Sequence, residues 1–150
     1  MSLVCKKVSV QSEDARLLIG ELNEALTAII GYNGTGHVDY SDFDRDRSVF
    51  MIGYDNGVPA CCAGIRNVDE TTGEVKRVYA RRNRSGNAAA LMKSLENWAS
   101  EQGYTRLILE CRQKDKHAIE FYDRTGYAVC EPYGPYVHID DAVCMDKHIG

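Results

Sequence analysis

The sequence predicts an α+β (α/β) fold, with a mixed, mostly antiparallel sheet of about seven strands flanked by three to four helices. Three observations lead to this prediction. Strand-like runs and helical periodicity follow one another in the order β-α-β-β-β-α-β-α-β-β. Asn56-Gly57 separates two of the strand-like runs, as in a hairpin turn. A helix lies between the fourth and fifth runs, which favours a parallel crossover at that point.

The first part of the chain shows a strand, a long helix and an irregular segment. Leu3–Val10 is the predicted strand, and Ser12 is placed to cap a helix that ends at Gly31. The irregular segment up to Arg47 carries three alternating aspartates, Asp42, Asp44 and Asp46. A calcium loop would need Gly at its sixth position and Glu at its twelfth, where Arg47 and Gly53 stand. A solvated acidic loop is therefore the better interpretation.

The middle of the chain predicts an antiparallel meander. Its strands are Ser48–Tyr54, Val58–Val68 and a third that covers Glu74–Ala80. The apolar run Leu107-Ile108-Leu109 within the next strand indicates a strand buried on both faces. Asp115 is placed to cap the following helix, and short strands over 127–130 and 142–147 complete the sheet.

The connection from the Glu74 strand to its helix has the composition of an anion site. Arg81, Arg82 and Arg84 supply positive charge, and Ser85–Ala88 carry small side chains at the expected helix start. The first amides of a helix lack intrahelical partners and sit at the positive end of its dipole, so they suit a phosphate. The alternative is an ordinary strand-to-helix connection whose arginines are solvated.

Composition limits the classes of function. The 150 residues predict one domain over 1–150, and no apolar run approaches the roughly 20 residues that span a bilayer. A net charge of −4 argues against non-specific nucleic-acid binding. The six cysteines show no zinc spacing, which predicts no metal site and a reduced, cytoplasmic protein.

Two motifs resemble those of the GNAT superfamily of N-acetyltransferases. Residues 83–88, Asn-Arg-Ser-Gly-Asn-Ala, are similar to its Gln/Arg-x-x-Gly-x-Gly/Ala loop, with Asn in the place of the usual Gln or Arg. Residues 117–127, ending in Phe-Tyr-Asp-Arg-Thr-Gly-Tyr, resemble its second motif, A-x-x-[LF]-Y-x-x-x-G-[FY]. The resemblance implies a GNAT-like sheet splayed between strands four and five, with acetyl-CoA as co-substrate and no metal.

The resemblance also implies roles for individual residues. The loop that carries Arg84, Ser85, Gly86, Asn87 and Ala88 would hold the CoA pyrophosphate, and Asp115 would contact the cofactor arm. The backbone of the fourth strand would lie along the pantetheine arm and polarise the thioester, at Val78, Tyr79 and Ala80. Tyr122 would protonate the departing thiolate.

The identity of the base is left open. Glu74 is the first candidate to accept the amine proton, with Glu110 or a water molecule as alternatives. Cys111 is interpreted as a packing residue. Aromatic and charged residues of the irregular segment and of the loop before the last strand are expected to choose the acceptor, namely Tyr32, His37, Tyr40, Asp42, Tyr133, Tyr136 and His138.

The resulting functional hypothesis is transfer of acetyl from acetyl-CoA to a primary amine of a small molecule or peptide, by direct attack in a ternary complex. Neither nucleic acid nor a membrane is an expected partner. Because family members are often dimers and edge strands need protection, a homodimer is expected. A non-catalytic acyl-CoA-binding sensor or regulatory module is the alternative.

Overall fold

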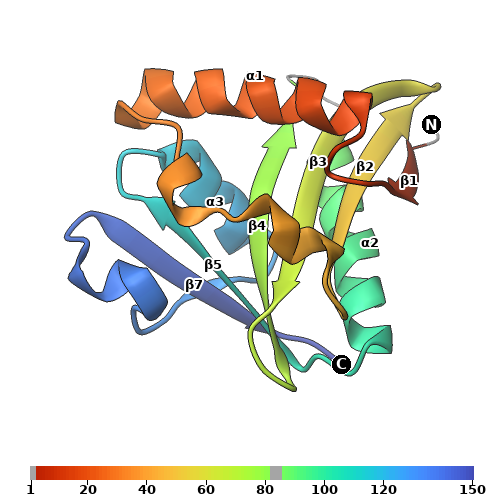
Figure 1. Ribbon diagram of the computed structural model, residues 1–150. Coiled ribbons are helices and arrows are strands. Elements are labelled where there is room, and N and C mark those ends of the chain that lie inside the picture. The colour runs from red at the N-terminus through yellow and green to blue at the C-terminus, as the bar shows by residue number, and fades with distance from the viewer. Residues whose placement is uncertain (1–2, 82–85) are drawn as a thin grey trace.

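The computed structural model describes residues 3–81 and 86–150. Its sheet has the strand order β1-β2-β3-β4-β5-β7-β6, and only β4 and β5 run parallel. The predicted mixed, mostly antiparallel sheet is confirmed (Figure 1). The strands are β1 (Leu3–Lys7), β2 (Val49–Asp55), β3 (Val58–Asn67), β4 (Thr72–Ala80), β5 (Arg106–Arg112), β6 (Ala128–Val129) and β7 (Ala142–His148). The helices are α1 (Glu13–Ile30), α2 (Asn87–Glu101) and α3 (Lys116–Arg124), with short 3₁₀ turns η1 (Thr35–His37), η2 (Tyr40–Asp44) and η3 (Gly134–His138).

Helices cover both faces of the sheet (Figure 1). Strand β2 shows why: Phe50 and Ile52 pack into the cluster under α1 and η2, whereas Met51 packs into the cluster under α2 and α3. Successive side chains of a strand point to opposite faces, so a continuous apolar run fits a sheet that is covered twice. In the described part of the chain, no helix is long and apolar enough to cross a membrane.

Local sequence signals determine the ends of the elements as expected. The Ser12 hydroxyl accepts a hydrogen bond from the Ala15 amide at 3.3 Å, and Gly31 ends α1 with a left-handed φ of 89°. Asn56 and Gly57 both have positive φ, at 52° and 80°, as a two-residue hairpin of the primed type requires. The predicted meander of β2, β3 and β4 is confirmed by their antiparallel pairing.

The sheet opens between β4 and β5. Their parallel pairing covers only Thr72–Glu74 against Arg106–Ile108, after which the two strands diverge (Figure 1). The splay expected between strands four and five is therefore present. Beyond Glu74, the edge of β4 that faces β5 has no strand pairing among the described residues, so its backbone amides and carbonyls are available to a ligand.

A bulge shapes β4 just beyond this point. The register with β3 shifts between Cys62 and Gly64, and Arg77 has a φ of 60°, which is rare for a residue with a side chain. The Arg77 guanidinium donates to the side-chain oxygen of Asn23 at 2.7 Å and to the Asn33 carbonyl at 3.1 Å. These bonds tie the bulge to α1 and to the segment that follows it.

Candidate active site

A cavity of about 140 Å³ lies where the sheet opens. Side chains from both diverging strands line it, together with residues of α1, α3 and η3. The polar or reactive members of this lining include Glu74, Lys76, Glu110, Arg112, Tyr122 and Tyr136. An engineered cavity of roughly 150 Å³ holds a benzene-sized ligand, so this one suits a small reacting group.

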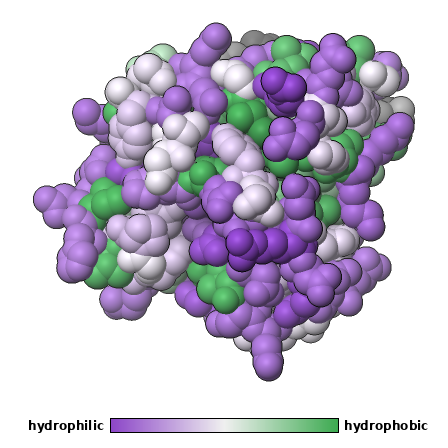
Figure 2. All heavy atoms as spheres, in the orientation of Figure 1, coloured by the Kyte–Doolittle hydropathy of each residue, from purple (hydrophilic) through white to green (hydrophobic). Residues whose placement is uncertain are grey.

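The visible face of the molecule is largely hydrophilic, with hydrophobic atoms in separate patches (Figure 2).

Glu74 is buried and has partners on both carboxylate oxygens. Oε1 accepts from Arg66 Nε at 2.6 Å, and Oε2 accepts from the Tyr133 hydroxyl at 2.7 Å. Lys76 Nζ lies 3.8 Å from Oε2. The Glu74 side chain is 2% exposed. Both oxygens of the Glu74 carboxylate are therefore engaged by partners within the protein.

Glu110 lies on the other wall of the opening. Its carboxylate accepts from Arg112 Nε at 2.5 Å, and its side chain is 12% exposed. Burial raises the pKa of Glu110, an effect that Arg112 partly offsets. A carboxyl whose pKa is shifted towards neutrality is a better general base than an ordinary one. Glu110 thus combines a raised pKa with a place on the cavity wall.

Tyr122 projects from α3 towards the same cavity. Its ring packs edge-on against Phe121 and Tyr127, with centroid distances of 5.4 and 5.7 Å. Among the described residues, no side-chain hydrogen bond involves the Tyr122 hydroxyl, whereas the Tyr127 hydroxyl donates to Glu96 at 3.0 Å. Burial raises the pKa of Tyr122. The hydroxyl is thus a proton donor with no intramolecular partner in the described part of the chain.

Cys111 also lines the cavity, next to Tyr122 in space. Burial raises the pKa of its thiol to about 12. The thiolate is the nucleophilic form, so this thiol is poorly suited to covalent catalysis near neutral pH. The environment of Cys111 agrees with its interpretation as a packing residue.

The start of α2 lies outside the cavity lining. Gly86 caps the helix with a left-handed φ of 71°, and a Cβ atom placed there would meet no atom of the described residues within 4 Å. Asn87 is buried, and its Oδ1 has no hydrogen-bond partner within residues 3–81 and 86–150. Ala88 follows in the first turn. The expected contacts of Arg84 and Ser85 fall outside the described residues, as do residues 82–83.

The three β4 residues expected to flank a cofactor differ in their surroundings. Val78 lines the cavity. The Tyr79 hydroxyl instead donates to Glu21 Oε1 at 3.1 Å, towards α1, and Ala80 pairs with Cys61 of β3. Asp115 lines the cavity while its carboxylate caps α3 by accepting from the Ala118 amide at 3.3 Å. Whether these four residues contact a cofactor remains a prediction.

The profile of the acetyltransferase (GNAT) family matches residues 16–127. The chain belongs to this family. It is 28% identical over 104 residues to the uncharacterized N-acetyltransferase YsnE of Bacillus subtilis, an alignment that covers 67% of this chain and 69% of that protein.

Solved structures share the fold of this GNAT protein at low sequence identity. A Klebsiella pneumoniae protein superposes with a TM-score of 0.82 at 21% identity, covering 99% of this chain and 98% of the other. An acetyltransferase from Streptococcus agalactiae gives 0.80 at 17% identity, covering 98% of each chain. The PaiA N-acetyltransferase of Thermoplasma acidophilum, in complex with coenzyme A, gives 0.75 at 16% identity and covers 99% of each.

Only some of the residues expected to select the acceptor of this GNAT protein lie together at the cavity. Tyr32, His37 and Tyr136 line the cavity, and Asp42 lines a second hollow beside it. Tyr133 reaches Glu74, whereas Tyr40 lies against the Arg77 guanidinium at 3.5 Å and His138 is exposed. Sequence reasoning did not single out Arg66, Lys76 and Arg112. The sequence feature that could have drawn attention to these three residues is a charged side chain within an otherwise apolar strand.

The described residues contain no group of three or more His, Cys, Asp or Glu side chains arranged to hold a metal ion. Two features of the structure fit acetyl-CoA, the co-substrate of the family. They are the unpaired edge of β4 beyond Glu74, which can bond to amides of a pantetheine arm, and the open space at Gly86 where α2 begins.

Proposed function

We propose that the protein is an acetyl-CoA-dependent N-acetyltransferase that acetylates a primary amine of a small molecule or peptide by direct attack. The observation that carries the proposal is the cavity between β4 and β5. It joins an unpaired strand edge, a carboxyl of raised pKa and an unpartnered phenol in one opening of the sheet. When bound, acetyl-CoA supplies an activated thioester at this opening. Family membership supports the same reaction class.

The chain's own groups then bind and orient the co-substrate. Amides at residues 84–88 would receive the pyrophosphate, because they stand at the positive end of α2 and because Gly86 leaves the approach open. The β4 backbone at residues 78–80 would hydrogen-bond the pantetheine arm and polarise the thioester carbonyl. Asp115, at the rim formed by α3, would flank the arm.

We assign the base to Glu110, with Glu74 in a supporting role. An attacking amine must lose its proton, and Glu110 combines a raised pKa with a place on the cavity wall. Glu74 instead holds Arg66 and Tyr133 at the opposite wall, on β4. Glu110→Gln is therefore expected to lower kcat more than Glu74→Gln. The reverse order would return the role to Glu74.

Tyr122 would protonate or hydrogen-bond the departing thiolate. A buried phenol with a raised pKa is matched to a thiol in the same surroundings, since burial raises thiol pKa values there as well, as it does for Cys111. The phenol thus donates to a thiolate whose proton affinity has risen in parallel.

The test is the rate of CoA release from acetyl-CoA across a panel of primary amines. Amine-dependent release, with the acetylated amine identified by mass spectrometry, supports the enzyme. A tight acetyl-CoA complex without turnover on any amine would instead support the non-catalytic acyl-CoA-binding module.

A further inference from the structure

Within the cavity, arginine and lysine side chains of the protein already pair with the carboxylates that could attract a positively charged acceptor. Arg66 and Lys76 flank Glu74, and Arg112 pairs with Glu110. The aromatic residues are engaged as well. Lys76 Nζ donates to the Tyr136 hydroxyl at 3.0 Å, and Arg112 Cζ lies 5.1 Å from the centre of the Tyr32 ring. An amine that enters the cavity meets carboxylates and rings that are already engaged.

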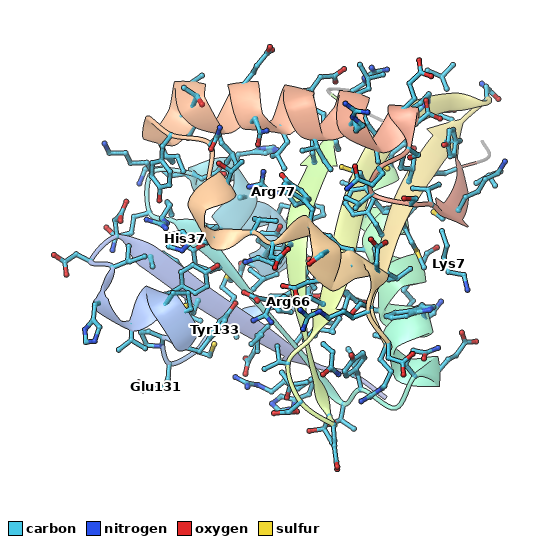
Figure 3. The ribbon with its side chains drawn as sticks, in the orientation of Figure 1. Lys7, His37, Arg66, Arg77, Glu131 and Tyr133 are labelled. Carbon is cyan, nitrogen blue, oxygen red and sulfur yellow. The ribbon has the colours of Figure 1, made fainter. Side chains whose placement is uncertain are left out.

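Lys76 stands at the junction of two hollows. It lines the cavity between β4 and β5, and it also lines a neighbouring hollow of about 340 Å³. Figure 3 shows His37, Arg66 and Tyr133 gathered around this part of the sheet from three separate segments. Lys76 Nζ donates to the His37 carbonyl at 2.6 Å and to the Tyr136 hydroxyl at 3.0 Å.

Apart from Glu74, the acidic residues that line the second hollow have partners other than Lys76. Asp42 lies 3.5 Å from Arg45, and Asp39 accepts from the amide and hydroxyl of Ser41. Glu74 is the one carboxylate within 4 Å of Lys76 Nζ among the described residues, and it is shared with Arg66 at a shorter distance. Two cations thus converge on one carboxylate at the junction.

The environment of Lys76 points to a missing anion. Its side chain is 10% exposed, and burial lowers the pKa of the ammonium. Glu74 and, less strongly, Glu110 oppose this effect, whereas Arg66 and Arg77 add to it. A negatively charged group bound at the junction would compensate this charge. Such a group would lie across the opening from Glu110, the proposed base.

We propose that the acceptor is an amino acid or short peptide that carries a carboxylate near its reacting amine, and that Lys76 receives this carboxylate. The inference rests on the proposed acetyl transfer and names its substrate class. The amine would point towards Glu110 and Tyr122 in the opening of the sheet. Lys76 then selects the acceptor by charge, because an amide or a decarboxylated amine leaves the ammonium with only the Glu74 carboxylate, which it shares with Arg66.

The experiment compares three versions of each acceptor: an L-amino acid, its amide and its decarboxylated amine. CoA release is measured as kcat/KM per concentration of neutral amine, so that different amine pKa values do not distort the comparison. The wild-type protein is expected to prefer the acid by roughly 10- to 100-fold, the range for a hydrogen bond to a charged group. Lys76→Met, which keeps the apolar stem, is expected to lose this preference, whereas Lys76→Arg retains most of it.

Equal rates for the acid and its amide in the wild-type protein would overturn the inference while leaving acetyl transfer intact. A loss in Lys76→Met that is the same for all three acceptors would also overturn it. If an aminoalkylphosphonate were a better acceptor than the amino acid, the junction would bind a different anion. That result would contradict the proposal that Lys76 receives a carboxylate.

Calorimetry provides a readout that needs neither turnover nor a variant. The wild-type protein should bind the N-acetylated acid more tightly than the N-acetylated amide, and salt should weaken the difference. Equal binding of the two would count against Lys76 as the carboxylate site. Absence of CoA release with every amine would reject the proposed function by itself, and the binding comparison would still decide the carboxylate.

Discussion

Tyr122→Phe separates the chemistry of the tyrosine from its packing. The substitution removes only the hydroxyl, and the ring keeps its edge-on contacts to Phe121 and Tyr127 at 5.4 and 5.7 Å. If the hydroxyl acts on the thiolate, kcat should fall by roughly 10²- to 10⁴-fold, the range for a general acid. Acetyl-CoA affinity should change little, because the lost interaction belongs to the transition state.

The expected effect on stability is small because the Tyr122 hydroxyl has no side-chain hydrogen bond among the described residues. Its removal should change the free energy of unfolding by less than about 1 kcal/mol. Tyr127→Phe is the matched control. The Tyr127 hydroxyl donates to Glu96, so that variant should lose roughly 1.5–3 kcal/mol of stability and keep its turnover.

The assay is single-turnover CoA release, paired with urea unfolding of both variants. Wild-type turnover by Tyr122→Phe, under conditions in which chemistry is rate-limiting, would exclude a role for the hydroxyl. An equal loss of activity in Tyr127→Phe would also contradict this role, because the effect would then come from repacking of the ring cluster.

Four further variants, a pH profile and a light-scattering measurement test the remaining inferences. Gly86→Glu should weaken CoA binding by about tenfold or more in calorimetry through bulk and like charge, whereas Gly86→Asn, which tolerates the left-handed φ, should bind better than Gly86→Glu. A general base must be ionised, and the pKa of Glu110 is raised above the ordinary carboxyl value of 4.5. The kcat/KM should therefore fall with decreasing pH, with a midpoint above pH 4.5. Glu110→Gln should abolish this acidic limb of the pH profile. Gly64→Ala should lower the free energy of unfolding by about 1–3 kcal/mol, because its Cβ would overlap Phe43. Light scattering should report a homodimer, and a monomer mass at high concentration would refute it.

Local signals in the sequence were sufficient to predict the helices and strands and much of their order along the chain. Ser12, Gly31 and Asp115 act within one turn of a helix, and Asn56-Gly57 closes a hairpin between neighbouring strands. Such features depend on residues close in the chain, so a pattern can reveal them. The motif around Tyr122 placed the chain in its family before any contact was known.

The charge balance of the site was decided by tertiary structure alone. Glu74 and Tyr133 are 59 residues apart in the sequence, and no rule of sequence spacing relates two residues at that separation. The bulge at Arg77 depends on bonds to Asn23 and Asn33, which belong to a different layer. Lys76 reads in the sequence as an ordinary strand residue. Its ammonium is enclosed, and shares Glu74 with Arg66, only because β4, η1 and η3 converge on it. Electrostatic environments are sums over groups brought together in space, and periodicity along the chain carries no record of that sum.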